Sequence, residues 1–357
     1  MKLFDTLAEF GHEQVVFFQE PQSGLKCVVA IHSTLLGPAL GGCRMWPYAS
    51  EEDALRDVLR LSQRMTYATA IAGLDLGGGK AVLIGDPETD KSEAALRQLG
   101  RAIDSLGGRY VTMEDVGTTT ADMDLVHRET DCVVGVGAAR GDPSPHTALG
   151  TFHGIRACLQ RRFGHEEVGR VTFAVQGAGH LGAHLVRLLR NEGAKVFVTD
   201  INEERVEEVV AESGAEAVPM SQIYDVDAQV FAPCAMGGVI NEDTVPRLRC
   251  QIVAGGANNQ LEANDWATEL ERRGILYAPD YAINAGGLID TALELTGYDP
   301  ADSQRRVVAI YDVLGHIFAT AEDEGIPTWQ AADRLVERRI ASVSRVKLPY
   351  STRASRG

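Results

Sequence analysis

Lysine is scarce in this chain of 357 residues: the 34 lysines and arginines include lysine only at positions 2, 26, 80, 91, 195 and 347. Arginine supplies nearly all the other positive charge. An arginine keeps its proton near neutral pH, whereas burial and neighbouring charges can turn a lysine into a base. Lys80, which directly follows three glycines, is therefore a candidate for proton chemistry. The alternative is a lysine in a flexible surface loop.

The chain also has no excess of positive charge, no closely spaced pair of cysteines and no long apolar run. Its formal net charge of −16 argues against nucleic acid or an anionic membrane as a partner. The 6 cysteines are scattered without a Cys-x-x-Cys pair, which predicts reduced thiols in a cytoplasmic protein. No apolar run approaches the length of a membrane span, and the N-terminus turns acidic at Asp5, too early for a secretory signal.

Length and patterning predict an α/β protein of two domains, each with its own core. We place the first domain at residues 1–143, with 326–357 packing back on it, and the second at 144–325. Strands and helices alternate in the second domain, which predicts a parallel sheet covered by helices. In the first, we expect strands at 15–18, 25–32, 81–84 and 110–113, helices from Ser50 and over 93–106, a loop at 37–42 and a turn at 77–80.

A glycine motif follows the first strand of the second domain and opens a helix. That strand is apolar, and Asp200 ends the next strand about 20 residues later. In such a motif the first glycine makes a tight turn, the second admits a pyrophosphate and the third allows close helix packing. We therefore predict dinucleotide binding by Gly177, Ala178, Gly179, His180, Leu181 and Gly182, together with Asp200 and Ile201. Asp200 would bind the ribose hydroxyls and repel a 2′-phosphate, which favours NAD over NADP; alternatively, it is a solvated helix cap.

Five further stretches resemble one family over nearly the whole chain and in the right order. They are residues 37–46 (GPALGGCRMW), 73–80 (GLDLGGGK), 114–118 (EDVGT), 254–261 (AGGANNQL) and 277–287 (YAPDYAINAGG). Together they resemble leucine dehydrogenases of the glutamate/leucine/phenylalanine/valine dehydrogenase family. The resemblance implies an N-terminal α/β domain for substrate and oligomerisation, a Rossmann-type NAD-binding domain and a cleft between them. It also implies reversible oxidative deamination of an L-amino acid to a 2-oxo acid, ammonia and NADH by a homo-oligomer.

The resemblance assigns roles to individual residues. Lys80 would activate the water that attacks the imino intermediate, and Asp115 would exchange protons with the substrate amine. Thr147 would orient the nicotinamide amide. Hydride departure needs a neutral amine and hydrolysis needs a base, so a lysine beside a carboxylate suits both steps. The expected substrate contacts are Leu40, Gly41, Gly42, Met65, Ala68, Met113, Asn259, Leu288 and Thr291; for Asn259 the alternative is an asparagine that stabilises a turn.

One departure from the family concerns the substrate carboxylate. Members carry a second lysine in a Met-Thr-Tyr-Lys stretch that binds this group, but here the stretch ends in Ala68. Loss of a charge-assisted hydrogen bond worth ~1.5 to 3 kcal/mol would weaken amino-acid binding by roughly 10-fold to more than 100-fold. Arg64 lies one helical turn earlier and could replace the lysine, or it could be a solvated surface arginine.

The side-chain pocket differs as well. Met113 adds bulk at a position that is small in leucine dehydrogenases, and Thr291 introduces a hydroxyl close to Leu288. A packing-neutral exchange is the alternative, because methionine adapts to its surroundings. Two rival functions therefore stand beside amino-acid oxidation: an amine dehydrogenase that acts on amines or ketones without a carboxylate, and a weakly catalytic NAD-binding sensor.

Overall fold

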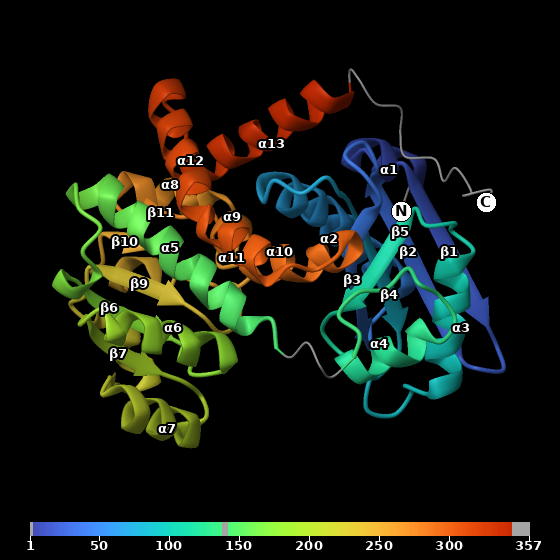
Figure 1. Cartoon of the computed structure of the whole chain (residues 1–357), viewed down its shortest axis with the longest axis horizontal. Helices are drawn as coiled ribbons and strands as arrows, with labels where there is room; N and C mark the ends of the chain where they lie inside the picture. Colours follow the sequence, from blue (N-terminus) through green and yellow to red (C-terminus); the bar gives the residue numbers. More distant parts are fainter. Residues whose placement is uncertain (1–2, 138–141, 345–357) are drawn as a thin grey trace. The chain divides into compact units, whose positions relative to one another are not determined.

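The computed structural model describes residues 3–137 and 142–344, which form two compact units. The first unit comprises the described residues up to 137, the segment Glu294–Gly297 and the described residues from Val336 onward; the second comprises Asp142–Leu293 and Tyr298–Leu335. Each unit contains one β-sheet with helices packed on it (Figure 1). The two-domain α/β fold predicted from the sequence is confirmed.

The first unit is built on a mixed five-stranded sheet. The strand order is β1 (Gln14–Glu20), β2 (Leu25–Ser33), β4 (Gly77–Ile84), β3 (Ala39–Trp46) and β5 (Tyr110–Glu114). β2 is antiparallel to both of its neighbours, whereas β3 is parallel to β4 and to β5. β4 therefore lies inside the sheet, and the carboxyl end of β5 delivers Asp115 at the sheet edge.

Helices cover both faces of this sheet because its strands alternate their apolar side chains. Val28, Ala30 and Val82 pack with α2 (Glu51–Ile71), against which α1 (Leu3–Phe10) also lies. The opposite face packs with α3 (Glu93–Asp104) and α4 (Thr120–His127) through Leu99 and Met123, which are both fully buried. Ser50 caps α2 as predicted, accepting a hydrogen bond from the backbone N–H of Asp53 at 3.1 Å.

Two segments that were predicted to be irregular form strands instead, so these predictions are wrong. The segment expected as a turn at 77–80 forms the first half of β4, and the loop expected at 37–42 contributes its last four residues to β3. The glycines are needed here for space, not for flexibility. A Cβ at Gly77 would lie 1.9 Å from the carbonyl oxygen of Ser33, one at Gly78 would lie 2.0 Å from the backbone nitrogen of Thr66, and one at Gly79 would lie 2.7 Å from the ring of Tyr110.

The second unit is built on a six-stranded sheet whose paired strands are all parallel. Its strand order is β11 (Leu276–Tyr277), β10 (Ile252–Val253), β9 (Val230–Pro233), β6 (Thr172–Gln176), β7 (Lys195–Thr199) and β8 (Glu216–Ala217). α6 (His180–Asn191) connects β6 to β7, and α7 (Glu203–Ser213) connects β7 to β8. This is the predicted parallel sheet, and crossover helices explain why the strands are short, apolar and evenly spaced.

α5 (Ser144–Phe163) packs against α6 and against α9 (Asp280–Ile283), α10 (Gly286–Ala292), α11 (Pro300–Val308) and α12 (Ile310–Glu324). α8 (Asp265–Arg272) packs beside β11. Residues 326–357 were expected to pack on the first domain, but α13 (Thr328–Ser344) belongs to the second unit as far as Leu335. Residues 345–357 of that prediction lie outside the described residues. Thr328 donates a hydrogen bond to the carbonyl oxygen of Tyr277 at 2.7 Å, and Trp329 packs on the core of the second unit. From Val336 onward the helix belongs to the first unit, where Arg339 pairs with Asp75 at 3.2 Å.

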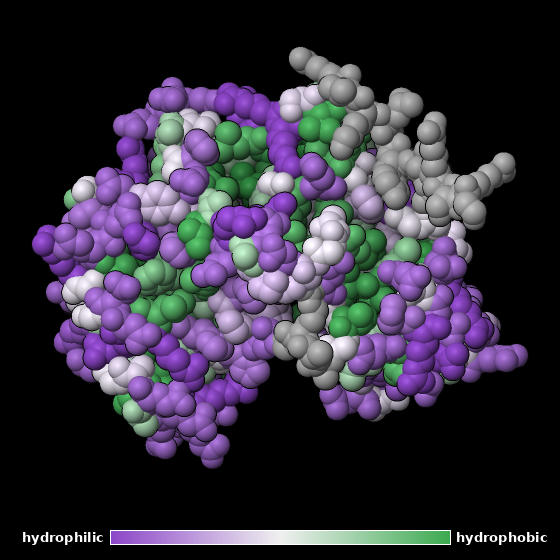
Figure 2. All heavy atoms as spheres, in the orientation of Figure 1, coloured by the Kyte–Doolittle hydropathy of each residue, from purple (hydrophilic) through white to green (hydrophobic). Residues whose placement is uncertain are grey.

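The surface is rich in charge. Figure 2 shows hydrophilic side chains gathered over α7, whose first turn carries Glu203 and Glu204. Of the cysteines, all of which are free thiols, only Cys132 is not fully buried. Within residues 3–137 and 142–344 no helix combines the length and the apolar character that a membrane span requires.

Candidate functional site

The first half of the candidate site is a buried ion pair between the middle of β4 and the residue after β5, two strands of the first unit that lie on either side of β3. Lys80 lies in β4, paired in register with Ala30, and only 3 % of its surface is exposed. Its Nζ donates a hydrogen bond to Oδ2 of Asp115, the residue that follows β5. A buried charge is stable only when it is paired, and Asp115 provides this partner. The loop lysine considered as an alternative is therefore wrong.

The charge state of Asp115 is set by its neighbours. Burial alone would raise the pKa of this carboxyl group, but the positive charges of Lys80 and Arg44 and the hydrogen bond from Lys80 outweigh burial and hold the pKa below its usual range. Nε of Arg44 donates to Oδ1 at 3.1 Å, and the backbone N–H of Val116 donates to the same oxygen at 2.7 Å. Asp115 is thus an ionised acceptor that faces a lysine donor.

The loop that carries Asp115 is tied to the sheet by its backbone. The backbone N–H of Asp115 donates to Oγ1 of Thr118 at 2.9 Å, and this hydroxyl donates to the carbonyl oxygen of Cys43 at 2.8 Å. Lys91 donates to the carbonyl oxygen of Gly117 at 3.1 Å and pairs with Asp122 at 2.9 Å. These contacts leave the carboxylate little freedom to turn away from Lys80.

Gly41 and Gly42 bring the β3 backbone close to the ion pair. A Cβ at Gly41 would lie 1.8 Å from the carbonyl oxygen of Gly79, and one at Gly42 would lie 2.8 Å from Oδ2 of Asp115. The hydroxyl of Tyr110 donates to the carbonyl oxygen of Gly41 at 2.7 Å, which fixes this backbone. Leu40, by contrast, is fully buried and acts as a core residue through its side chain.

The other predicted substrate residues of the first unit lie on α2 and β5. Met65, Ala68 and Arg64 are half-buried on α2, and Cγ of Met65 lies 3.3 Å from where a Cβ of Gly41 would be. Met113 is half-buried on β5 and pairs in register with Gly42. The structure thus brings Met65 and Met113 to the strand segment that holds Gly41 and Gly42.

The glycine turn of the second unit has the geometry predicted for a dinucleotide site. Gly177 has φ of 113°, a conformation that favours glycine, and a Cβ at Gly182 would lie 1.9 Å from the carbonyl oxygen of Gly177. A Cβ at Gly179 would meet open space, and this residue precedes the first turn of α6. Ala178 is buried, Leu181 is half-buried, and His180 pairs with Asp142 at 2.6 Å. The turn therefore leaves room beside a helix N-terminus that suits phosphate.

Asp200 lies directly beside this turn. Its Oδ2 accepts a hydrogen bond from the backbone N–H of Ala178 at 2.7 Å, and its Oδ1 accepts one from the N–H of Asn202 at 2.9 Å. The N-cap of α7 is Asn202, so Asp200 is not the helix cap considered as an alternative. The next residue, Ile201, leaves 83 % of its surface exposed. A carboxylate and an apolar side chain at the end of β7 suit ribose and a flat base, respectively.

Thr147, Leu288 and Thr291 lie on two helices of the second unit that cross closely. A Cβ at Gly287 in α10 would lie 2.5 Å from Oγ1 of Thr147 in α5, so glycine permits this approach. Leu288 and Thr291 are half-buried and three residues apart on α10, on the same side of the helix.

Asn259 has φ of 52°, the only positive φ outside glycine among residues 3–137 and 142–344. Its carbonyl oxygen accepts a hydrogen bond from Gly238 at 2.7 Å. Asparagine tolerates this conformation better than most residues, so the geometry supports the turn-forming role. A contact with substrate remains a prediction.

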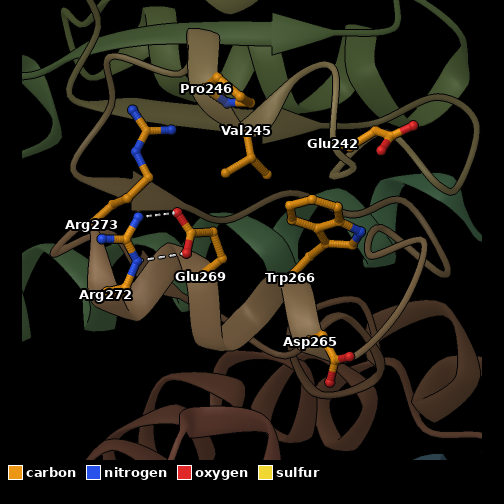
Figure 3. A pocket seen from close by; sticks show the side chains of 8 residues that line it. All are labelled: Glu242, Val245, Pro246, Asp265, Trp266, Glu269, Arg272 and Arg273. Carbon is orange, nitrogen blue, oxygen red and sulfur yellow. Dashed lines mark hydrogen bonds and ion pairs between the residues drawn. The ribbon is translucent and has the colours of Figure 1, made fainter.

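One pocket of the second unit contains none of the predicted residues (Figure 3). Trp266 and Val245 form its apolar part, while Arg272 donates two hydrogen bonds of 2.7 Å each to Glu269. Arg273 donates to the carbonyl oxygen of Leu248 at 3.0 Å. Arg272 and Glu269 thus satisfy each other, whereas Arg273 is held by a backbone carbonyl.

Sequence reasoning did not assign a role to Arg44, Asp57, Tyr48 or Tyr110. Arg44 lies within one of the motifs, directly after Gly42 and Cys43, so its place in the chain was a usable signal. Asp57 lies on the same stripe of α2 as Arg64 and Ala68, at helical spacing. The contacts that join these residues to Asp115 come from strand pairing and could not be seen in the sequence.

Similarity to known proteins extends over both units. The family model for the Glu/Leu/Phe/Val dehydrogenase dimerisation domain matches residues 12–132, and the model for glutamate/leucine/phenylalanine/valine dehydrogenase matches residues 197–305. Leucine dehydrogenase of Thermoactinomyces intermedius is 51 % identical over 353 residues, which cover 98 % of this chain and 96 % of that protein. Phenylalanine dehydrogenase of Bacillus thermotolerans is 45 % identical over 95 % of this chain and 90 % of its own. The crystal structure of L-tryptophan dehydrogenase from Nostoc punctiforme superposes with a TM-score of 0.88 at 44 % identity, covering 96 % of this chain and 99 % of that one.

Proposed function

This chain belongs to the glutamate/leucine/phenylalanine/valine dehydrogenase family, and we propose that it oxidises a branched-chain or aliphatic L-amino acid with NAD, reversibly, to the 2-oxo acid and ammonia. The predicted family resemblance and amino-acid dehydrogenase class are confirmed. The substrate belongs to the proposal, because relatives of similar identity are named for leucine, phenylalanine and tryptophan.

The observation that carries the proposal is the buried Lys80–Asp115 pair beside Gly41 and Gly42. The pair can pass a proton between an ammonium and a carboxylate with little movement. Asp115 takes the proton that the substrate ammonium must lose before hydride leaves the α-carbon. Lys80 must first give up its ammonium proton to solvent; as a neutral amine it then takes a proton from the water that attacks the imino carbon. The two glycines let substrate approach the β3 backbone.

The second unit offers residues that fit NAD. The turn from Gly177 to Gly182 has the required φ and the open space, and Asp200 lies at its side. When bound, NAD accepts the hydride from the amino acid. A 2′-phosphate on the cofactor would meet the negative charge of Asp200, so we propose NAD rather than NADP. We further propose that Thr147 orients the nicotinamide amide and that Ile201 contacts the adenine.

We propose that the first unit supplies the acid–base residues and the second holds the cofactor. A homo-oligomer is part of the proposal, since the family model that matches residues 12–132 is described as a dimerisation domain.

Ala68 supports a second candidate function. The family lysine that binds the substrate carboxylate is absent, so an amine or ketone without a carboxylate loses less binding at this site than an amino acid does. Met113, Leu288 and Thr291 then define the shape available to the side chain. A sensor without catalysis is disfavoured, because Lys80 and Asp115 are both present and paired.

The test is an NADH assay across branched-chain, aliphatic and aromatic L-amino acids and the amines that lack their carboxylates. The proposal expects kcat/KM to be highest for leucine, valine or isoleucine. Higher kcat/KM for the amines would establish the second candidate. A chain that binds NADH and turns over none of these compounds would be the sensor.

A further inference from the structure

The two oxygens of Asp115 have different partners. Oδ2 receives the ammonium of Lys80, while Oδ1 receives Nε of Arg44 at 3.1 Å and the backbone N–H of Val116 at 2.7 Å. A carboxylate held at only one oxygen can rotate about its Cβ–Cγ bond. One held at both oxygens cannot. The N–H of Val116 holds Oδ1 from the loop that carries Asp115 itself, whereas Arg44 holds the same oxygen from a different element, β3.

Arg44 is itself fixed from a third element. Its Nη1 donates to Oδ2 of Asp57 on α2 at 3.0 Å, and the hydroxyl of Tyr48 donates to the same oxygen at 2.6 Å. The other oxygen of Asp57 accepts from Arg60 at 3.0 Å. The side chains of Arg44 and Asp57 are 20 % and 15 % exposed, so the pair is shielded from solvent more than a surface salt bridge.

We propose that Arg44, braced by Asp57 and Tyr48, is a positioning residue for the proton transfer of the proposed reaction: it clamps Oδ1 of Asp115 so that Oδ2 remains directed at Lys80. The inference rests on the proposed function. Arg44 contacts no reacting atom in this scheme and acts through Asp115 alone.

The same contacts set the electrostatic surroundings of the Asp115 carboxylate. The groups that face Asp115 are Lys80 from β4, Arg44 and Cys43 from β3, Tyr110 from β5 and Thr118 from its own loop. Only Lys80 and Arg44 among these carry positive charge, and Lys91 is committed to Asp122 and to the Gly117 carbonyl. Removing Arg44 therefore takes one of two cations from Asp115 and raises its pKa. The acid limb of the pH profile of kcat/KM then moves to higher pH.

The experiment compares Arg44→Gln, Arg44→Lys and Arg60→Gln in the full chain. Arg60→Gln is the matched control, because it removes the same charge from the other oxygen of Asp57 and has no contact with Asp115 among the described residues. We expect Arg44→Gln to lower kcat at least about tenfold with unchanged KM for NAD, Arg44→Lys to restore part of the loss, and Arg60→Gln to stay within about twofold of the parent.

Titration of Asp115 gives a second readout that needs no turnover. 13C NMR of carboxyl-labelled aspartate, with the Asp115 signal identified by its absence in Asp115→Asn, should show the carboxyl of Arg44→Gln titrating about one pH unit above the parent. Arg60→Gln should titrate like the parent. Equal titration of the Arg44→Gln and Arg60→Gln proteins would overturn the proposal, even where the parent proves inactive on every substrate and the proposed function fails. If Arg44→Gln does not fold, Asp57→Asn replaces it, with an upward displacement of the Asp115 titration expected and an unmoved one counting against the clamp.

Discussion

The ammonium of Lys80 and the carboxylate of Asp115 form a buried ion pair that joins the middle of β4 to the end of β5. We expect Lys80→Ala to abolish turnover and to leave NADH affinity nearly unchanged, because the cofactor turn belongs to the second unit. Lys80→Arg is the control for charge: it keeps a cation beside Asp115 but cannot release its proton, so it should be almost as inactive. Activity of either variant within a few-fold of the parent would show that the base lies elsewhere. Stopped assays measure turnover, and fluorescence titration with NADH measures the affinity for the cofactor.

Ala68→Lys should lower KM for aliphatic L-amino acids at least about tenfold. The new ammonium restores a charge-assisted hydrogen bond worth ~1.5 to 3 kcal/mol to the substrate carboxylate. The same substitution should leave KM for the corresponding amines unchanged. If it has no effect on amino acids while Arg64→Ala abolishes their binding, Arg64 is the carboxylate anchor. Steady-state kinetics with paired amino acids and amines separates the two outcomes.

Asp200→Asn should narrow the preference for NAD over NADP by removing the negative charge that opposes a 2′-phosphate. The amide oxygen can still accept the hydrogen bond from Ala178 that holds the glycine turn, whereas its NH2 group cannot accept the second one from the N–H of Asn202. The ratio of kcat/KM for the two cofactors is the measurement. Equal efficiency of the parent with both cofactors would contradict the role given to Asp200.

Gly78→Ala should destabilise the first unit by about 1 to 3 kcal/mol, since the new Cβ would lie 2.0 Å from the backbone nitrogen of Thr66 and must push β4 and α2 apart. Gly315→Ala is the matched control. Gly315 is exposed within α12 and a Cβ there meets nothing within 4 Å. This exchange should stabilise the helix by about 0.5 to 1 kcal/mol. Thermal unfolding of both variants tests the contrast, and similar midpoints would contradict it.

Stability of the first unit should fall as the pH drops from about 6.5. Burial, followed by the charge of His32, lowers the pKa of His12 from 6.5 to about 4, and burial also lowers the pKa of His32. These histidines therefore bind protons in the unfolded chain at pH values where they stay neutral in the folded unit. The free energy of unfolding consequently falls between pH 6.5 and about 4. At pH 5 we expect a loss of about 1 to 2 kcal/mol relative to pH 7. His12→Asn should flatten this dependence in urea unfolding monitored at both pH values, whereas an unchanged slope would exclude His12.

The sequence predicted the fold well where periodicity and local chemistry agree. The strands at 25–32 and 110–113 and the helix that starts after Ser50 were placed correctly, because apolar alternation and caps are local signals. It failed at Gly77 to Lys80, where glycine suggests a turn but crowding by Ser33, Thr66 and Tyr110 makes glycine necessary in a strand. Those neighbours are distant in sequence, so no local pattern could reveal them.

The same limit applies to the site. The contact of Lys80 with Asp115 could be expected because their motifs are distinctive, and the turn formed by Gly177, Gly182 and Asp200 because their spacing reflects a known geometry; their roles in a reaction stay predictions. The Arg44–Asp57 pair could not, since its partners come together only when β3 pairs with β4 and β5 and α2 packs on the sheet. The unit to which the start of α13 belongs was missed for a comparable reason. Thr328 and Trp329 are held on the second unit by side-chain contacts that the helical pattern does not encode.

The three glycines before Lys80 restrict how this enzyme can evolve. Positions 77, 78 and 79 have no room for a side chain, so natural variation and laboratory mutagenesis alike cannot change the surroundings of Lys80 by adding one at these three positions. Changes in reactivity or substrate range must enter from other segments, of which the half-buried positions Met65, Ala68 and Met113 have side chains that can be exchanged. A mutant library aimed at new substrates should therefore hold β4 constant and randomise α2 and the end of β5.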